Sequence, residues 1–412
     1  MTHWIKQHGI GAAGRLRQAA AIALAAAVLF SSAELWASPD SAPGARQLLP
    51  APVIAGLKSL LGTVGRQPTG AFPEAQAATV IDFVSNTPSK DALYHAGGDF
   101  AEASAYHRFD VKQDMTEFLQ LAFNPHIPSY ALMPSSVRFC KWSAADGKEA
   151  PFPKLWTDLD TLDAPRIIRG IETMENTPDT FSGAYYTYDL YRTTIMMRHR
   201  GLPVLISLSK QTDVSGTGKK GVVLGEDDNW SYLYSDQNGI TKPGLGWVKS
   251  YMYDSYSVSV YVQPEGSPGW VACGVFKWVR AGWSSINMVK PEHIYSGLVR
   301  YGNSFSAVMN DPRLPSAHQM SVVFDKISRF TTQELREKFR TYLAFVQKRY
   351  GSDTAFPRDW FTEWFQSSTY LERVTKDQMQ ATLVVEYIRQ LLGKPACIDL
   401  TELIHARPRA AG

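Results

Sequence analysis

The hydrophobic period of the chain changes once between residues 256 and 309, and this change limits the folds open to it. In "YSVSVYVQ", residues 256–263, the valines point to one side, while serine and tyrosine point to the other. Alternation of this kind predicts a strand in a sheet with one buried face. From Pro291 onward, apolar residues recur every three or four positions, as on one face of a helix with proline in its first turn. This stripe consists of Ile294, Leu298, Tyr301, Phe305 and Val308.

Several earlier segments also predict strands, and short turns join them. Residues 185–201 and 202–211 are rich in Tyr, Ile, Val and Thr with a glycine between them, which predicts a hairpin. The Asn-Gly pair at 238–239 is a strong hairpin cue within residues 229–247. Residues 272–280 predict a further strand. Successive strands with short connections predict an antiparallel meander, without the strand–helix–strand alternation of a parallel sheet.

The opening of this region has its own strand and helix signals. Ala105, His107, Phe109 and Val111 alternate with polar neighbours, which predicts a half-buried strand. Asp114 is suited to be the N-cap of a short helix that continues to residue 122.

The segment "GVFKWVRAGWSSINMVKPEHI", residues 274–294, combines aromatic and cationic residues. Strand alternation places Val275, Lys277 and Val279 on one face and the residues Phe276, Trp278 and Arg280 on the other. With Pro291 at its end, we interpret the segment as the joint between the last strand and the helix that covers the sheet. Any function would then depend on the room that Trp278 and Trp283 leave beneath this helix.

The C-terminal part, residues 311–412, predicts helices only. Thr331 with Glu334 and Thr375 with Gln378 have the spacing of capping boxes, and glycines at 351 and 393 suit the helix ends. Residues 38–98 are rich in Pro, Ala, Gly and Ser and predict a loose lead-in with one short helix at 51–62. We therefore expect a main α+β domain over 99–310 and a helical extension over 311–412.

The N-terminal 37 residues predict a secretory signal peptide. A basic flank at residues 15–17 precedes about a dozen apolar residues and then small residues, with cleavage expected near Ala37. An uncleaved anchor is the alternative. The formal net charge of +3 falls to about +1 without this segment, because it carries three cations against Glu34. A near-neutral chain offers no basic field for nucleic acid. Because no later stretch of the sequence reaches the length of a membrane helix, we expect a soluble periplasmic or secreted protein.

Motifs for metals, nucleotides and disulfides are weak or absent. The loop "SGTGKKG", residues 215–221, lacks the first glycine and the Ser/Thr of a phosphate-binding loop, so we expect a flexible glycine loop between strands. The segment "GEDDNW" is typical of an acidic turn, and a metal at Asp227 and Asp228 is the alternative. We therefore expect no cofactor and no metal. Three cysteines allow at most one internal disulfide, and buried, unreactive thiols are the alternative. They are Cys140, Cys273 and Cys397.

The group "AYYTYDLYRTTIMMRHR", residues 184–200, places large, partly polar side chains on both faces of one strand. Tyr186, Tyr188, Arg192 and Met196 share one face. Three interpretations remain open: a packed sheet with a solvated outer face, a pocket for a hydrophobic ligand, and a surface that stacks on carbohydrate.

The order of strand, short helix, antiparallel meander and long amphipathic helix resembles the helix-grip fold of the START-like (SRPBCC-type) lipid-binding superfamily. The stretches that carry the resemblance are "YHRFDVKQDMTEFLQLAF" and the closing strands with "SSINMVKPEHIYSGLVRYGNSFSAVM". It implies an α+β fold in which an antiparallel sheet grips a long amphipathic helix, with a tunnel for sterol, phospholipid or another apolar molecule. The helical extension and the long 141–182 segment depart from that family.

Three functional hypotheses follow. The first is non-catalytic binding or transport of a hydrophobic, lipid-like ligand in the cell envelope, with Arg192 or a tyrosine hydroxyl holding its polar head. Peripheral membrane contact is compatible with it, no nucleic-acid partner is expected, and the sequence does not identify a protein partner. The second is an envelope hydrolase using the His107/Asp110 and Asp189/Arg192 regions, and the third is an interaction protein that docks through its helical tail. The candidate ligand-binding residues are Tyr186, Tyr188, Arg192, Met196, Trp278, Trp283 and His107.

Overall fold

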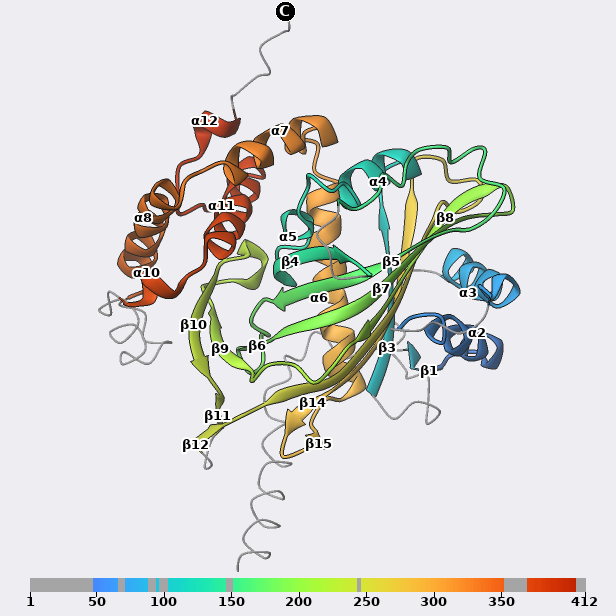
Figure 1. Ribbon diagram of the computed structural model, residues 1–412, viewed down its shortest axis with the longest axis horizontal. Coiled ribbons are helices and arrows are strands. Elements are labelled where there is room, and N and C mark those ends of the chain that lie inside the picture. The colour runs from blue at the N-terminus through green and yellow to red at the C-terminus, as the bar shows by residue number, and fades with distance from the viewer. Residues whose placement is uncertain are drawn as a thin grey trace, which may run out of the picture. The chain divides into compact units, whose positions relative to one another are not determined.

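The strand that contains the alternating valines of residues 256–263 lies near the middle of a large sheet in the computed structural model (Figure 1). The structure describes residues 47–65, 71–87, 94–95, 103–145, 151–242, 246–351 and 369–404. The predicted signal peptide and the cleavage site near Ala37 lie outside these residues. Among the helices within them, none has the length and apolar character needed to cross a membrane.

Within the described residues the main sheet has ten strands, in the order β1-β2-β3-β14-β13-β8-β7-β5-β4, with β15 paired to β14. Its pairs are antiparallel except for β1 with β2. The strands are β1 (Gln47–Leu48), β2 (Tyr94–His95), β3 (Ala103–Val111), β4 (Val137–Ala144), β5 (Arg166–Asn176), β7 (Thr187–His199), β8 (Leu202–Gln211), β13 (Tyr251–Val262), β14 (Val271–Trp283) and β15 (Ile286–Asn287). The predicted mixed α+β fold with a large antiparallel sheet is confirmed.

The predicted hairpin at 185–211 is strands β7 and β8. Arg200 and Gly201 connect them, with φ angles of 50° and 79°, and His199 pairs with Leu202. Two consecutive residues with positive φ make the type I′ turn, whose twist matches that of the flanking strands.

The Asn-Gly prediction was wrong. Asn238 ends β10 (Tyr232–Asn238), which pairs with β9 (Lys219–Val223), and β9 also pairs with β6 (Ala184–Tyr185). Gly239, with φ 95°, donates its N–H to the Gly218 carbonyl. The chain therefore turns away from β10, and β11 (Ile240–Lys242) pairs instead with β12 (Gly246–Val248). The expected flexible glycine loop at 215–221 contains the start of β9.

Both faces of the main sheet are covered, where the sequence predicted one buried face. Helices α2 (Ala51–Leu61) and α3 (Glu74–Asn86) lie on one side, which we call the outer face (Figure 1). The described lead-in thus holds two packed helices where one was expected. The valines of β13 pack under these helices, and Gly274 lets Val84 of α3 approach so closely that an added Cβ would lie 2.5 Å from it.

The opposite side, the inner face, is covered by α6 (Pro291–Met309), as Figure 1 shows. The helix has the predicted residues, and its apolar stripe packs toward the sheet. Gly302 brings it against β3, because an added Cβ would lie 2.7 Å from the Phe109 ring. Arg300 secures it from the other side through a hydrogen bond of 2.6 Å from Nε to Asp227, which lies in the short 3₁₀ helix Asp227–Asn229.

The remaining helices extend the core of the inner face. They are α4 (Met115–Ala122), α5 (Ser129–Leu132), α7 (Ala317–Ser328), α8 (Thr332–Tyr350), α10 (Thr369–Arg373), α11 (Lys376–Leu391) and α12 (Thr401–Ile404). Asp114 caps α4 by accepting the Glu117 N–H, and Thr331 and Thr375 cap α8 and α11, so these predictions are confirmed. The helix α11 packs on α5 and β4, so the helical extension shares the core of the sheet.

Candidate functional site

The inner face of the sheet carries polar side chains in its middle, and the strand register places them in rows across the strands. One row crosses β5, β7, β8, β13, β14 and β3 as Gly170, Arg192, Ser209, Ser257, Lys277 and Ala105. The next row crosses the same strands as Ile168, Thr194, Ser207, Ser259, Val275 and His107. Residues paired in this way point to the same side of a sheet. We call these twelve residues the polar rows.

The centre of the polar rows consists of small hydroxyl side chains that are buried. Ser207, Ser209, Ser257 and Ser259 are between 1% and 9% exposed. The hydroxyls of Ser209 and Ser257 hydrogen-bond each other across 2.5 Å. Valine, isoleucine and leucine are usual at such positions, because burying hydroxyl groups is unfavourable unless they are hydrogen-bonded. The serines therefore depend on hydrogen-bond partners at this face, such as the Arg192 guanidinium that donates to Ser207.

An apolar row borders the polar rows on one side. Met196, Leu205, Tyr261, Cys273 and Phe109 form it, and all are buried. Phe118 of α4 packs on Tyr261, with ring centroids 5.1 Å apart. The inner face thus changes from apolar to polar along the strands, as a ligand with an apolar body and a polar end would require.

Arg192 and Glu172 form an ion pair beside the serines. The Arg192 Nε lies 2.8 Å from the Glu172 carboxylate, its Nη2 also donates to that carboxylate, and its Nη1 donates to Ser207 at 3.1 Å. The Cys140 thiol donates to the other oxygen of Glu172 at 3.3 Å. The two side chains keep 18% and 14% of their surface accessible, although β5 and β7 are internal strands. The pair is therefore not sealed into the core.

Lys277 is the second cation of the polar rows. Its ammonium donates to Ser255 at 2.7 Å, and the ion pairs found among the described residues do not include it. Burial, and to a smaller extent the charge of Arg192, lowers its pKa to about 8. The protein thus holds a lysine charge where its environment disfavours it.

His107, Tyr188, Arg192 and Met196 lie on the inner face, where alternation placed the last three together. The His107 ring meets the Tyr295 ring edge-on at 5.7 Å, and burial lowers the pKa of His107 to about 4, so it is neutral at pH 7. The Tyr188 hydroxyl contacts the Met174 sulfur at 3.3 Å. Their shared location is established, and their role in binding remains a prediction.

The other three predicted residues do not join them. Trp278 lies on the outer face under α2 and α3, because it is one residue from Lys277 and strand alternation reverses its direction. The expectation that it lines a space beneath α6 was therefore wrong. Trp283 pairs with Ile286 at the end of β14, about 20 Å along the strand from Lys277. Tyr186 lies between β6 and β7 and donates to Ser250 at 3.0 Å.

The acid–base pairs considered for a hydrolase are separated by the same geometry. His107 points to the inner face and Asp110 to the outer face, where it pairs with Arg108 at 2.9 Å. Arg192 points inward, whereas Asp189 accepts from Thr173 on the opposite face at 2.6 Å. Neither pair can act on one substrate atom. Among the described residues no group of three His, Cys, Asp or Glu side chains is placed to hold a metal, and all three cysteines are free.

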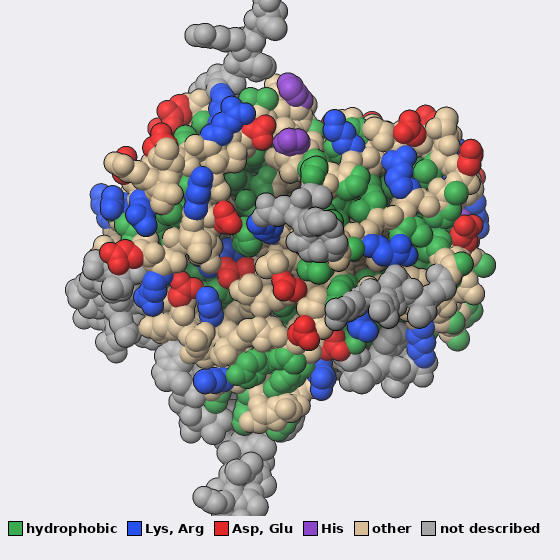
Figure 2. All heavy atoms as spheres, in the orientation of Figure 1, with side chains coloured by type: hydrophobic (Ala, Val, Ile, Leu, Met, Phe, Trp, Pro, Cys, Tyr) green, Lys and Arg blue, Asp and Glu red, His purple; other side chains and the backbone are tan. Residues whose placement is uncertain are grey.

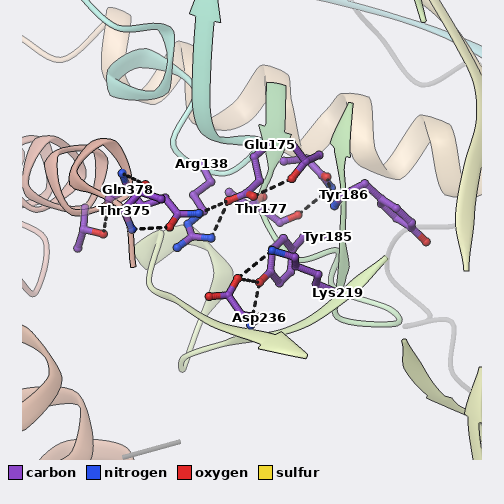
Figure 3. A network of polar contacts seen from close by, with 12 residues as sticks. Arg138, Glu175, Thr177, Tyr185, Tyr186, Lys219, Asp236, Thr375 and Gln378 are labelled. Atoms are coloured by element: carbon purple, nitrogen blue, oxygen red, sulfur yellow. Dashed lines mark hydrogen bonds and ion pairs between the residues drawn. The ribbon is translucent and has the colours of Figure 1, made fainter. Parts of the chain in front are cut away.

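A second polar network, drawn in Figure 3, joins the sheet to α11 and to the small sheet of β6, β9 and β10. Arg138 and Glu175 pair at 2.6 Å with only 5% and 6% of their side chains exposed. The guanidinium lies 3.8 Å from the centre of the Tyr234 ring, and Gln378 of α11 reaches Glu175 at 3.5 Å. The charged groups of this network are paired with one another, which indicates a structural role, although the buried Arg138 Nε has no hydrogen-bond partner.

Comparisons with known proteins find little. No protein-family model matches the chain, and no curated protein is similar enough to match it. One solved structure is similar, the human StarD13 (DLC2) lipid transfer and protein localization domain, at 16% identity and a TM-score of 0.25, covering 57% of this chain and 98% of that chain. At these values the likeness adds no weight to the architecture, which rests on the register and packing described above.

The exposed side chains bear on the hypothesis that the protein docks through its helical extension. The large exposed hydrophobic residues of the described chain are Leu48, Phe181, Val214, Trp270, Ile286 and Met288. None of them lies on α7, α8 or α11, so these helices present no exposed apolar stripe for docking. Figure 2 shows acidic and basic side chains mixed over the visible face, in keeping with the near-neutral net charge.

Proposed function

We propose that the protein binds or carries a hydrophobic, lipid-like ligand without catalysis, in a helix-grip arrangement with the ligand between the inner face and α6. The observation that supports this is the buried polar rows on a covered sheet face. The serine side chains there are small and fill little of the space that a leucine or valine would occupy. An amphipathic ligand would supply the missing apolar contacts and would use the hydroxyls as hydrogen-bond partners. At about 25 cal/mol per Å² of apolar area, burying an acyl chain supports micromolar affinity.

We further propose that the protein is exported to the periplasm or secreted after cleavage near Ala37. The layout of residues 1–37 supports this. A ligand carrier in the cell envelope would meet lipids there. N-terminal sequencing of protein recovered from the periplasmic fraction tests it, with Ser38 expected as the first residue. Retention of residue 1 in membrane-bound protein would instead indicate an anchor.

The binding proposal is tested by native mass spectrometry of gently purified protein, followed by solvent extraction and lipid analysis. We expect a mass excess that solvent removes and that reappears as an extracted lipid. Ser257→Leu fills the centre of the polar rows and should abolish the excess while circular dichroism stays unchanged. Ser296→Leu, at an exposed position of α6, should retain it.

Two results would contradict the proposal. A clean polypeptide mass together with no binding of fluorescent fatty-acid or sterol probes would exclude the function. Full ligand retention in a folded Ser257→Leu variant would exclude the location.

A further inference from the structure

The charges in and beside the polar rows do not balance. Arg192 and Lys277 are cationic, His107 is neutral at pH 7, and the Glu172 carboxylate is paired with Arg192. Three nitrogens of Arg192 are already bonded to Glu172 and Ser207. Lys277 has one hydroxyl partner, Ser255, and three N–H donors. Within the part of the chain that the structure describes, the positive charge of Lys277 is therefore left without an anion.

Lys277 also has neutral donors nearby. Arg192, Ser209, Ser257 and Lys277 stand on four adjacent strands of one row, so both cations flank the paired serine hydroxyls. In the neighbouring row the Thr194 side chain is 1% exposed, and its hydroxyl has no hydrogen-bond partner. A buried hydroxyl without a partner is rare in native proteins and indicates a missing group.

The position suits a negatively charged oxygen group. An uncompensated cation under a covering helix is destabilising, and an anion that pairs with it while accepting hydroxyl hydrogen bonds removes that penalty. One monoanion neutralises the single excess charge, whereas a phosphate dianion would leave the rows net negative. The apolar row of Met196, Leu205 and Tyr261 lies beside this position and would accommodate the chain of the ligand.

We propose that the polar rows select an acidic amphipathic ligand, a long-chain carboxylate whose head group pairs with Lys277 and accepts hydrogen bonds from the neighbouring hydroxyls. This rests on the proposed lipid-binding function and narrows its ligand class. Lys277 is thereby assigned as the residue that determines specificity for charge, since the charge of Arg192 is already neutralised by Glu172.

The experiment compares two probes that share one acyl chain but carry a charged or a neutral head group, the fluorescent polyene cis-parinaric acid and its methyl ester, titrated into the delipidated full-length protein at pH 7. We expect the acid to bind about tenfold more tightly or better, the usual effect of one charge-assisted contact. Lys277→Met should bring the acid down to the affinity of the ester and leave the ester within about twofold. Lys277→Arg, which keeps the charge, should retain a preference for the acid.

Lys210→Met is the matched control. Lys210 lies on β8 next to Ser209 but points to the outer face, over the Tyr256 ring, so its removal should leave the preference for the acid intact. Equal binding of acid and ester by the wild type, or an unchanged preference in folded Lys277→Met, would overturn the selection of acids and leave lipid binding standing. Failure of both probes, with no co-purifying lipid, would overturn both proposals.

Discussion

Replacing Lys277 by methionine should make the empty protein more stable at neutral pH. The pKa of Lys277 falls from 10.5 to about 8 in the folded state, mainly through burial. At about 1.4 kcal/mol per pKa unit, holding the charge at pH 7 costs up to about 3 kcal/mol. Partial exposure reduces this, and loss of the hydrogen bond to Ser255 offsets about 1 kcal/mol. We therefore expect a net gain of about 1–2 kcal/mol in the free energy of unfolding.

The gain should depend on pH in a defined direction. Between pH 8 and 10.5 the unfolded chain binds the Lys277 proton and the folded protein does not, so this group makes the wild type more stable as pH rises. Lys277→Met lacks that contribution. Its advantage at pH 7 should thus shrink and vanish near pH 10.5.

Urea unfolding followed by tryptophan fluorescence at pH 7 and pH 10, for wild type, Lys277→Met and Lys210→Met, measures this. Other groups titrate equally in all three proteins and cancel in the comparison. A Lys277→Met variant that is less stable than wild type at pH 7, or whose advantage is the same at both pH values, would refute the assignment of an uncompensated charge.

Three further predictions concern stability in urea unfolding. Gly302→Ala should cost about 1–3 kcal/mol, since its Cβ would lie 2.7 Å from the buried Phe109 ring. Gly297→Ala on the same helix has open space around it and should be neutral or stabilising by up to about 1 kcal/mol. Equal effects of the two substitutions would contradict the close helix–sheet contact. His107→Gln should remove part of the loss of stability between pH 6.5 and 4. Neutral His107 stabilises the fold above pH 6.5, and this contribution is lost as pH falls through its pKa of about 4. If the free energy of unfolding of the variant depends on pH as it does in the wild type, a buried neutral imidazole is contradicted. Arg138→Met should cost about 3–5 kcal/mol by stranding a buried carboxylate, and a loss below about 1 kcal/mol would show that the pair is not buried.

Local signals in the sequence were sufficient for the starts of α4, α6, α8 and α11 and for the faces of two strands. The caps at Asp114, Thr331 and Thr375 depend on residues within one helical turn, and Pro291 fixes the start of α6. The faces of β13 and β14 follow from alternation alone. These features were predicted correctly because their causes lie close together in the chain.

The candidate site was harder to predict, because it depends on which face is covered and on pairing between distant strands. The serines at 257 and 259 were visible as one face of a strand, but such a face usually meets solvent. Only the register, with Ser209, Ser257 and Lys277 opposite one another, shows that they are one buried row. Because the sequence does not show which face α6 covers, it also led us to expect Trp278 beneath α6 rather than under α2 and α3.

Pairing between the earliest and latest long strands of the sheet also constrains the order of folding. Val111 at the end of β3 pairs with Val271 at the start of β14, so β3 has no long partner until most of the chain has been made. Contacts this distant in sequence form slowly, and an unpaired apolar strand is prone to aggregate meanwhile. Until β14 has been made, β3 is therefore the strand that a chaperone shielding unpaired apolar segments would bind.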